Sequence, residues 1–362
     1  MRLVASKIGV VAVGYGYWGP NVVRNLAEHP EFRLLTLCEL DAARAAEFSR
    51  RYPECAVERR LEAALEDPRV EAVAIATPPS SHYEIAREAL EAGKHVLVEK
   101  PLAATAPQAA ELVALAEQRG LVLMPGHTFV YSPPVNKVRE LIRTGELGDP
   151  HFVTSSRMNL GLYQPDGVIR DLAPHDISIL LHWFDQPVVQ VTASGCSVFN
   201  EGVLETAFIT LELAGGVCAN IQLSWLAPRR MRQTIVVGSR RMIQYDDTAG
   251  DEQVRVYDRG LEFGPIESFG EHQLSYRTGD MVAPRIQAAE PLALELEDFA
   301  TAIRTGVEPQ SSARLGLHVV QVLEACEESL RRGGYPVAVP LESHADLGSP
   351  DVLESLARAA AP

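Results

Sequence analysis

Short apolar runs alternate with helical stretches rich in Ala, Glu and Arg from Ile8 to about Gly126. This alternation is typical of βαβ units, and runs that are apolar on both faces indicate parallel strands covered by helices. The predicted strands are 8–13, 32–38, 70–76, 95–98 and 122–125, and the predicted helices are 20–27, 41–51, 81–92 and 107–118. We therefore expect a parallel sheet in the first third of the chain.

The pattern changes beyond His151. One helix is predicted over 172–183, and a series of alternating segments follows it without intervening helices. Consecutive strands of this kind form a meander, which makes a mostly antiparallel sheet. The segments are 188–198, 205–213, 218–225, 233–238, 242–246 and 253–257, followed by helices over 292–304 and 313–332 and a last short helix that starts near Ser349. The expected fold class is α/β, with a parallel sheet first and a large, mostly antiparallel open sheet second.

Chain length sets the number of domains. At roughly 150 residues per domain, 362 residues predict two domains. The Pro133–Pro134 pair interrupts the chain after the parallel sheet and marks the region of the linker. We expect a first domain over 1–127, an α/β domain over 128–340 whose last helices can pack back on the first domain, and a tail over 341–362.

Composition narrows the classes of protein. The 33 basic and 48 acidic side chains give a net charge of −15, which opposes binding to nucleic acid or to an anionic membrane. No segment approaches the roughly twenty apolar residues of a membrane helix, and the run over 8–13 is too short for a signal peptide. Five scattered cysteines without a Cys-x-x-Cys pair indicate neither disulfides nor a zinc site. A cytoplasmic protein without a bound metal is expected.

The turn after the first predicted strand reads Gly-Tyr-Gly-Tyr-Trp-Gly. In a Gly-x-Gly-x-x-Gly turn the first glycine allows a tight bend, the second a close approach to a pyrophosphate, and the third close packing of the helix on the strand. The expected contacts with the dinucleotide are Gly14, Gly16, Tyr17, Trp18 and Gly19. An ordinary glycine-rich turn between a strand and a helix would have the same spacing, so the context of strand and helix carries the prediction.

An acidic residue, Glu39, stands 20 positions after Gly19, at the end of the second predicted strand. A carboxylate there accepts a hydrogen bond from the ribose 2′-hydroxyl and repels a 2′-phosphate. The sequence therefore favours NAD over NADP. Arg44, on the next helix, could reach a phosphate, but a solvated surface charge is the preferred interpretation of this residue.

Lys100 follows the fourth predicted strand in the run Val-Leu-Val-Glu-Lys-Pro. Pro101 favours an extended conformation at Lys100 and keeps it at the carboxyl edge of the sheet, where open α/β sheets bind ligands. A partly desolvated lysine there exchanges protons with a substrate hydroxyl more readily. A surface lysine beside Glu99 in a turn is the simpler alternative.

Asp171 and His175 are four residues apart at the start of a predicted helix and therefore share one of its faces. Spacing alone favours a helix-capping aspartate and a buried structural histidine over a catalytic pair. The other motifs of the chain decide which interpretation is preferred.

These motifs together resemble the Gfo/Idh/MocA family of oxidoreductases. The glycine turn, the Ala-Thr-Pro-Pro-Ser-Ser-His run, the Glu-Lys-Pro run, and Asp171 with His175 occur in the order and at the spacing of that family. The resemblance extends from Lys7 to about Pro340. It implies an N-terminal Rossmann domain and a C-terminal α/β domain whose open sheet carries the substrate site and joins subunits, here as a homodimer or homotetramer.

The resemblance also implies roles for individual residues. The catalytic positions are Lys100, Asp171 and His175, and the residues that line the cofactor cleft are Thr77, Pro78, His82 and Glu99. A secondary alcohol on a sugar gives its hydride to nicotinamide while His175 takes the hydroxyl proton and Lys100 polarises the oxygen. Which of Lys100 and His175 transfers the proton stays open, as does the direction of the reaction. From the residues alone, Pro78 and Pro79 indicate only a turn.

Local positive charge suggests the kind of sugar. Arg157, Asn159 and Arg230 are candidate substrate contacts, because arginines in a strongly negative chain suit the phosphates of a nucleotide-activated sugar. The Gly126–Pro133 run resembles members of the family that act on such sugars at C3, although the arginine that many of them carry near Tyr131 is absent. Solvated or salt-bridged arginines are the alternative. A dehydrogenase of free sugars or inositol and a non-catalytic dinucleotide-binding regulator are the rival functions.

Overall fold

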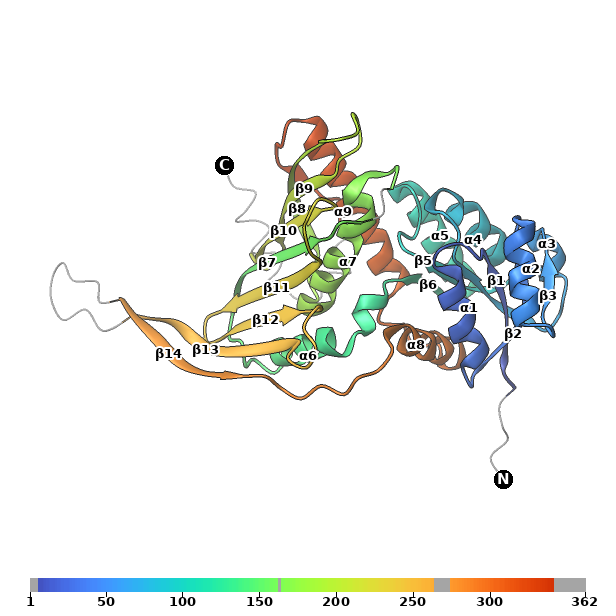
Figure 1. The fold of residues 1–362 in the computed structure, drawn as a ribbon, viewed down its shortest axis with the longest axis horizontal. Coiled ribbons are helices and arrows are strands. Elements are labelled where there is room, and N and C mark those ends of the chain that lie inside the picture. The colour runs from blue at the N-terminus through green and yellow to red at the C-terminus, as the bar shows by residue number, and fades with distance from the viewer. Residues whose placement is uncertain (1–5, 162–163, 264–273, 342–362) are drawn as a thin grey trace, which may run out of the picture. The chain divides into compact units, whose positions relative to one another are not determined.

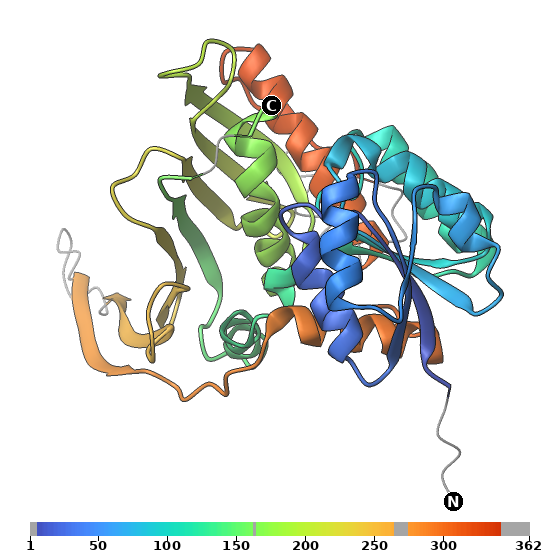
Figure 2. The same ribbon diagram turned by 45° about the vertical axis from the view of Figure 1, so that its right-hand side comes forward.

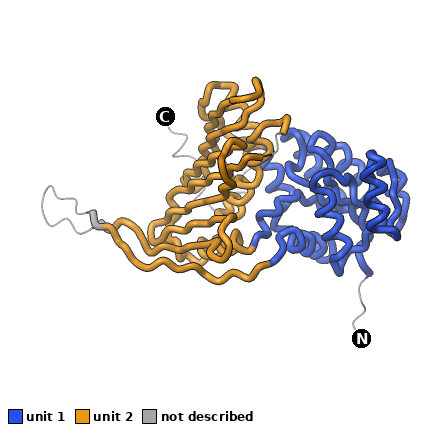
Figure 3. The backbone as a smooth tube through the Cα atoms, viewed as in Figure 1, with its two compact units in different colours: residues 1–132, 289–320 blue, residues 133–288, 321–362 orange. Residues whose placement is uncertain are grey.

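The computed structural model describes residues 6–161, 164–263 and 274–341. The chain forms two compact units, shown in Figure 3. Unit 1 comprises 1–132 and 289–320, and unit 2 comprises 133–288 and 321–362. The short helix predicted near Ser349 lies outside the described residues.

Unit 1 contains a six-stranded parallel sheet in the order β3-β2-β1-β4-β5-β6. Its strands are β1 (Ile8–Val13), β2 (Phe32–Cys38), β3 (Ala56–Glu58), β4 (Val70–Ile75), β5 (His95–Glu99) and β6 (Leu123–Gly126). Its helices are α1 (Gly19–Glu28), α2 (Ala42–Arg51), α3 (Leu61–Leu65), α4 (His82–Glu91), α5 (Ala106–Arg119), α8 (Pro291–Thr305) and the first part of α9 (Ala313–Arg331). The parallel sheet that we predicted is confirmed. The pattern missed β3 and α3, which are too short to show a period.

Alternate residues of each strand pack on the two faces of this sheet. Val11 and Val13 lie in a core with α4 and α5, while Val10 and Ala12 lie in a second core with α1 and α8. Helix α8 comes from near the end of the chain and packs beside α1 (Figure 1). The Tyr131 hydroxyl, after β6, donates a 2.8 Å hydrogen bond to Asp298 of α8. Both faces are thus covered, one of them by a helix from far along the sequence.

The order of the strands locates a ligand site in unit 1. Strand β1 lies between β2 and β4, so the chain reverses its direction of progress across the sheet at β1 and β4. Open α/β sheets bind ligands outside the carboxyl ends of the strands at such a switch point. The glycine turn follows β1 there, and Thr77 follows β4.

Unit 2 is built on a nine-stranded sheet in the order β14-β13-β12-β11-β7-β10-β9-β8-β15. Its strands are β7 (Pro150–Met158), β8 (Val188–Cys196), β9 (Thr206–Leu213), β10 (Cys218–Ser224), β11 (Met231–Gly238), β12 (Met242–Asp246), β13 (Val254–Phe263), β14 (Leu274–Val282) and β15 (Val337–Ala338). Strand β7 pairs in parallel with β10, and the other neighbours are antiparallel. The mostly antiparallel sheet is confirmed.

The predicted meander was wrong at its centre. Strand β7 lies between β10 and β11, which are consecutive in sequence but do not pair. The pattern missed β7 because Ser155 and Arg157 fill two of its inward positions and are polar although they are buried. Strand β7 therefore lacks the alternation of apolar and polar residues by which a half-buried strand is predicted.

Helices α6 (Pro133–Arg143) and α7 (Gly167–Phe184) belong to unit 2, and α7 packs on β9 and β10 (Figure 2). Helix α7 begins five residues before the predicted start at Leu172 and contains Pro174 in its interior. On this sheet Phe152, Phe208 and Ile235 have exposed side chains. Among residues 6–161, 164–263 and 274–341, no helix is long and apolar enough to cross a membrane.

Candidate active site

The glycine turn of unit 1 is shaped by close backbone contacts. Gly14 has a φ of 92°, and a Cβ on it would stand 2.8 Å from the carbonyl oxygen of Ala76. A side chain is excluded there on both grounds. The turn leads into α1, whose first amides donate no hydrogen bond to the side chain of the N-cap residue, Trp18. Uncapped amides at a helix N-terminus suit an anion such as a pyrophosphate.

Glu39 is held at the end of β2 by two backbone amides. Its carboxylate accepts hydrogen bonds from Tyr15 N at 2.7 Å and from Asp41 N at 2.8 Å. Each carboxylate oxygen has a second acceptor site, so a ribose hydroxyl can still bind. The guanidinium of Arg44 lies 3.6 Å from where a Cβ on Gly16 would stand, so a phosphate contact of Arg44 is also feasible. The turn, Glu39 and the exposed Tyr17 side chain fit a bound dinucleotide.

Lys100 follows β5 at the carboxyl edge of the same sheet. Its backbone N lies 3.3 Å from a carboxylate oxygen of Glu99. Burial raises the pKa of Glu99, and the positive charge of Lys100 opposes that rise only in part. A partly neutral carboxyl therefore stands beside the lysine.

His82 differs from its predicted role as a lining residue of the cofactor cleft. Its side chain is fully buried, and its ring nitrogens lie 2.8 Å from the carbonyl oxygen of Pro101 and 2.9 Å from that of Thr77. It begins α4 and joins the loop after β4 to the loop after β5. His82 thus holds the segments of Thr77 and Lys100 in place instead of facing a ligand. Pro78 lies in the first of these loops, where Ser81 Oγ donates a 2.8 Å hydrogen bond to its carbonyl oxygen.

Two buried groups near Lys100 were missed by the sequence analysis. His127 directly follows β6, and neither of its ring nitrogens has a hydrogen-bond partner among the described residues. Burial and the charge of Lys100 lower the pKa of His127 to about 3. Glu295, on α8, is buried too, and burial followed by the charge of Glu99 raises its pKa. The position of His127 after a strand was a usable signal, whereas nothing in the sequence placed Glu295 beside this edge.

In unit 2, Asp171 and His175 lie on α7. Most of this helix is buried, and its partly exposed residues are Arg170, Asp171, Leu172 and His175. The Trp225 indole, after β10, donates a 3.1 Å hydrogen bond to Asp171 Oδ2. The structure therefore presents Asp171 and His175 together on one accessible face, one helical turn apart. Trp225 is a further residue of this site that the sequence analysis did not assign.

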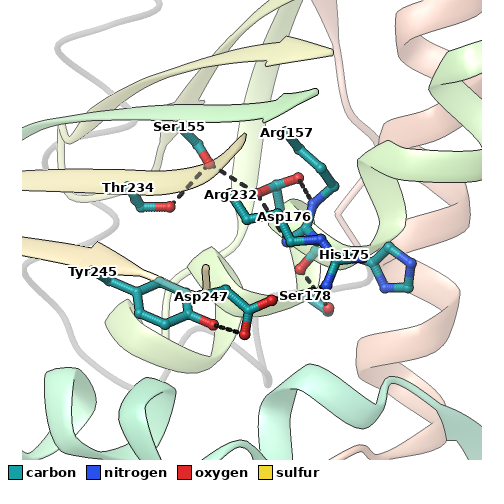
Figure 4. Close-up of polar contacts among 9 residues, drawn as sticks. All are labelled: Ser155, Arg157, His175, Asp176, Ser178, Arg232, Thr234, Tyr245 and Asp247. Carbon is teal, nitrogen blue, oxygen red and sulfur yellow. Dashed lines mark hydrogen bonds and ion pairs between the residues drawn. The ribbon is translucent and has the colours of Figure 1, made fainter. Parts of the chain in front are cut away.

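Arg157 does not lie where a substrate contact is expected. Its side chain is 4% exposed, and its guanidinium donates to both carboxylate oxygens of Asp176, at 2.6 and 3.3 Å (Figure 4). The inward alternation of β7 and the countercharge of Asp176 explain this burial. Arg230 is exposed, and Asn159 is half-buried next to Gly161. A substrate contact of Arg230 or Asn159 stays a prediction.

Comparisons with known proteins assign the family. Residues 8–127 match the oxidoreductase family with an NAD-binding Rossmann fold, and residues 135–244 match the GFO/IDH/MocA C-terminal domain. The chain belongs to the Gfo/Idh/MocA family. Unit 1 is therefore an NAD-binding Rossmann domain of an oxidoreductase, as the resemblance implied.

Three similar proteins illustrate the family. The UDP-N-acetylglucosamine 3-dehydrogenase of Acidithiobacillus ferrooxidans is 29% identical, over 83% of this chain and 90% of that protein. The scyllo-inositol 2-dehydrogenase (NADP(+)) IolW of Bacillus subtilis is 24% identical, over 89% of this chain and 93% of that protein. The crystal structure of GenD2 from gentamicin A biosynthesis in complex with NAD is 25% identical and has a TM-score of 0.77, over 93% of this chain and 97% of that chain.

Each unit thus gathers its own part of the predicted site. Unit 1 brings the glycine turn and Glu39 together at the switch point and carries Lys100 with Glu99 at the same sheet edge. Unit 2 brings Asp171 and His175 together on α7. A common action of Lys100 with His175 stays a prediction. In the described part of the chain, no three His, Cys, Asp or Glu side chains are grouped to hold a metal ion.

Proposed function

We propose that this oxidoreductase transfers a hydride between NAD and a secondary alcohol or ketone of a sugar, namely a nucleotide-activated sugar at C3. The observation that carries the proposal is the accessible face of α7, where an otherwise buried helix presents Asp171 and His175. The dinucleotide turn of unit 1 and the named activity of the UDP-N-acetylglucosamine relative support it.

Lys100, His175 and Asp171 have distinct roles in this proposal. Bound nicotinamide supplies the acceptor and donor of the hydride. His175 accepts the proton of the reacting hydroxyl, and the ammonium of Lys100 holds and polarises the same oxygen. Asp171, fixed by the Trp225 indole, orients this pair. In the reverse direction the same groups return the proton to a ketone oxygen.

NAD is the preferred cofactor in this proposal because Glu39 places a negative charge at the end of β2. Its carboxylate receives the ribose hydroxyls and repels a 2′-phosphate. Arg44 near Gly16 is the group that would moderate this preference, since its charge attracts a phosphate. The ratio of NAD to NADP affinity tests which residue dominates.

A dehydrogenase of free sugars or inositol is the second candidate. The burial of Arg157 with Asp176 favours it, because it removes one of the arginines expected to bind a nucleotide phosphate. Every proposed catalytic residue is shared by the two candidates. They differ only in whether Arg230 and its neighbours meet a phosphate.

The decisive experiment is a turnover assay with the purified protein. NAD and NADP are supplied with a panel of UDP-, dTDP- and GDP-sugars, free hexoses and inositols, and nicotinamide absorbance is followed in both directions. Turnover restricted to nucleotide sugars supports the proposal, and turnover of free sugars or inositol supports the second candidate. Binding of NADH without turnover of any compound would identify a non-catalytic dinucleotide-binding regulator instead.

We also propose that the second sheet joins copies of the chain into a homodimer or homotetramer. Phe152, Phe208 and Ile235 are large apolar side chains exposed on its strands, and exposed apolar surface is one mark of an interface between proteins. Sedimentation velocity tests this assembly. A monomer at micromolar concentration would contradict it.

A further inference from the structure

A buried charged pair in unit 2 joins the candidate catalytic helix, α7, to the sheet. Arg157, on β7, and Asp176, on α7, are 4% and 3% exposed. Their shortest contact joins Arg157 Nε to Asp176 Oδ2 at 2.6 Å. Burial opposes the charge of Arg157, but the Asp176 carboxylate outweighs this effect and raises the pKa of the guanidinium. Arg157 therefore remains charged in the interior of unit 2.

Such a pair is weak evidence for stability. Desolvation of two ions largely offsets their attraction, and apolar residues of similar volume often stabilise a protein equally well or better. A buried ion pair differs from apolar packing chiefly in direction, because its hydrogen bonds are satisfied in only one geometry. The pair is better suited to fixing an orientation than to adding stability.

The pair belongs to a hydrogen-bonded network that joins α7 to two strands, β7 and β11 (Figure 4). Ser155 Oγ donates to Asp176 Oδ1 at 2.8 Å and lies 2.9 Å from Thr234 Oγ1 on β11. The Asp176 carboxylate thus receives two bonds from Arg157 and one from Ser155, all from β7. The sheet thereby specifies the rotation of α7 about its axis.

A second pair supports the first. Arg232 is the cross-strand neighbour of Arg157, and it bonds Asp247 at 2.8 Å. The Tyr245 hydroxyl donates to the same carboxylate at 3.2 Å. Two adjacent arginines would repel each other, so each is matched with its own aspartate. This arrangement leaves Arg157 directed at Asp176 (Figure 4).

Asp176 follows His175 in α7, so a bond that fixes Asp176 also fixes the stretch of backbone that carries the His175 imidazole. Neighbouring side chains of a helix point about 100° apart and turn together with the helix. A rotation of α7 that breaks the Asp176 bonds therefore also turns the His175 side chain. Pro174 lacks an N–H group, so α7 has one backbone hydrogen bond fewer at this position. The helix therefore depends on side-chain contacts to fix its rotation here.

We propose that the Arg157–Asp176 pair is a positioning element that fixes the rotation of α7 and thereby the direction of the His175 imidazole. Its effect on turnover rests on the proposed function, whereas its effect on the orientation of the imidazole does not. Arg157 thus acts through Asp176 and His175 instead of through a substrate phosphate.

The test compares variants of the pair with a control at the other end of α7. Arg157→Lys keeps a charge but loses the two-bond geometry, and the double variant Arg157→Met with Asp176→Leu removes both charges. Arg139→Met is the control, because Arg139 bonds Asp185 at 2.8 Å beyond the C-terminal end of α7. We expect kcat to fall about 10- to 100-fold in both pair variants, with KM and NADH affinity changed less than about threefold. Arg139→Met keeps the kcat of the wild type.

Thermal unfolding separates positioning from stability. The double variant is expected to unfold near the wild-type temperature while its kcat stays low. If the double variant has both the unfolding temperature and the kcat of the wild type, the proposal is overturned, because the pair would then be needed only for folding.

An NMR measurement keeps the test independent of catalysis. The ring resonance of His175, assigned with His175→Gln, is expected to shift or split in Arg157→Lys and to stay unchanged in Arg139→Met. An unchanged resonance together with an unchanged kcat refutes the positioning role. A shifted resonance in a protein that turns over no sugar supports the positioning role and refutes the proposed function.

Discussion

The two units bury ionisable side chains beside their candidate catalytic residues in opposite ways. In unit 1, His127 and Glu295 are buried near Lys100 and Glu99 without an opposite charge bonded to either of them among the described residues. In unit 2, Arg157 is bonded to Asp176. Burial without a bonded countercharge shifts pKa values, whereas burial with one fixes geometry. The surroundings of Lys100 in unit 1 are therefore expected to respond to pH, and those of His175 in unit 2 to changes of side-chain shape.

The largest expected effect tests whether both units serve one reaction. Lys100→Met in unit 1 and His175→Gln in unit 2 should each lower kcat by about 100- to 10,000-fold, because each removes a group that handles the proton or the oxygen. NADH binding, measured by fluorescence titration, should survive in both variants. Unchanged turnover in either variant would remove that unit from the catalytic proposal.

The next effect tests the buried histidine of unit 1. The pKa of His127 is lowered from 6.5 to about 3, so between these values the unfolded chain binds a proton that the folded chain does not. Stability therefore falls as the pH falls from 6.5 towards 3, by about 1.4 kcal/mol per pH unit for this group. His127→Leu should flatten the slope by this amount in urea unfolding at several pH values. The exposed His151→Gln is the control, and equal slopes in the two variants would contradict the assignment.

Glu295 should give a slope of the opposite sign. Its pKa is raised above 4.5, so as the pH rises through 4.5 the unfolded chain loses a proton that the folded chain keeps. Stability is fully present below pH 4.5 and is lost as the pH rises, by at most about 1.4 kcal/mol per pH unit. Glu295→Gln should therefore gain stability relative to the wild type above pH 4.5 in the same urea experiment. A constant difference across the pH range would argue for a role in packing alone.

The smallest expected effect concerns Glu39 of unit 1 and the preference for NAD over NADP. Glu39 is an acid held by two backbone amides, so it resembles the bonded groups of unit 2 more closely than Glu99 and Glu295 do. Glu39→Ser should narrow the preference for NAD over NADP by about tenfold, because the repulsion of a 2′-phosphate is lost. Dissociation constants for both cofactors provide the measurement. Equal affinity of the wild-type protein for NAD and NADP would contradict the role of Glu39.

The sequence by itself determined much of unit 1. The bounds of β1 and β2 agree with the predicted strands, because parallel strands that are buried on both faces are nearly continuous apolar runs. The glycine turn was visible because the backbone contact between Gly14 and Ala76 excludes a side chain. Local constraints of this kind act on residues close together in the chain, and each leaves a pattern in the sequence.

Only the tertiary structure decided the surroundings of the candidate catalytic residues. Strand β7 pairs with both β10 and β11 and lies between them. In this position Arg157, which the sequence suggested as a substrate contact, is the partner of Asp176. Glu295 reaches the neighbourhood of Glu99 because α8 folds back onto the first sheet. Charge pairs and burial depend on which distant segments meet, and no local period in the sequence encodes that meeting.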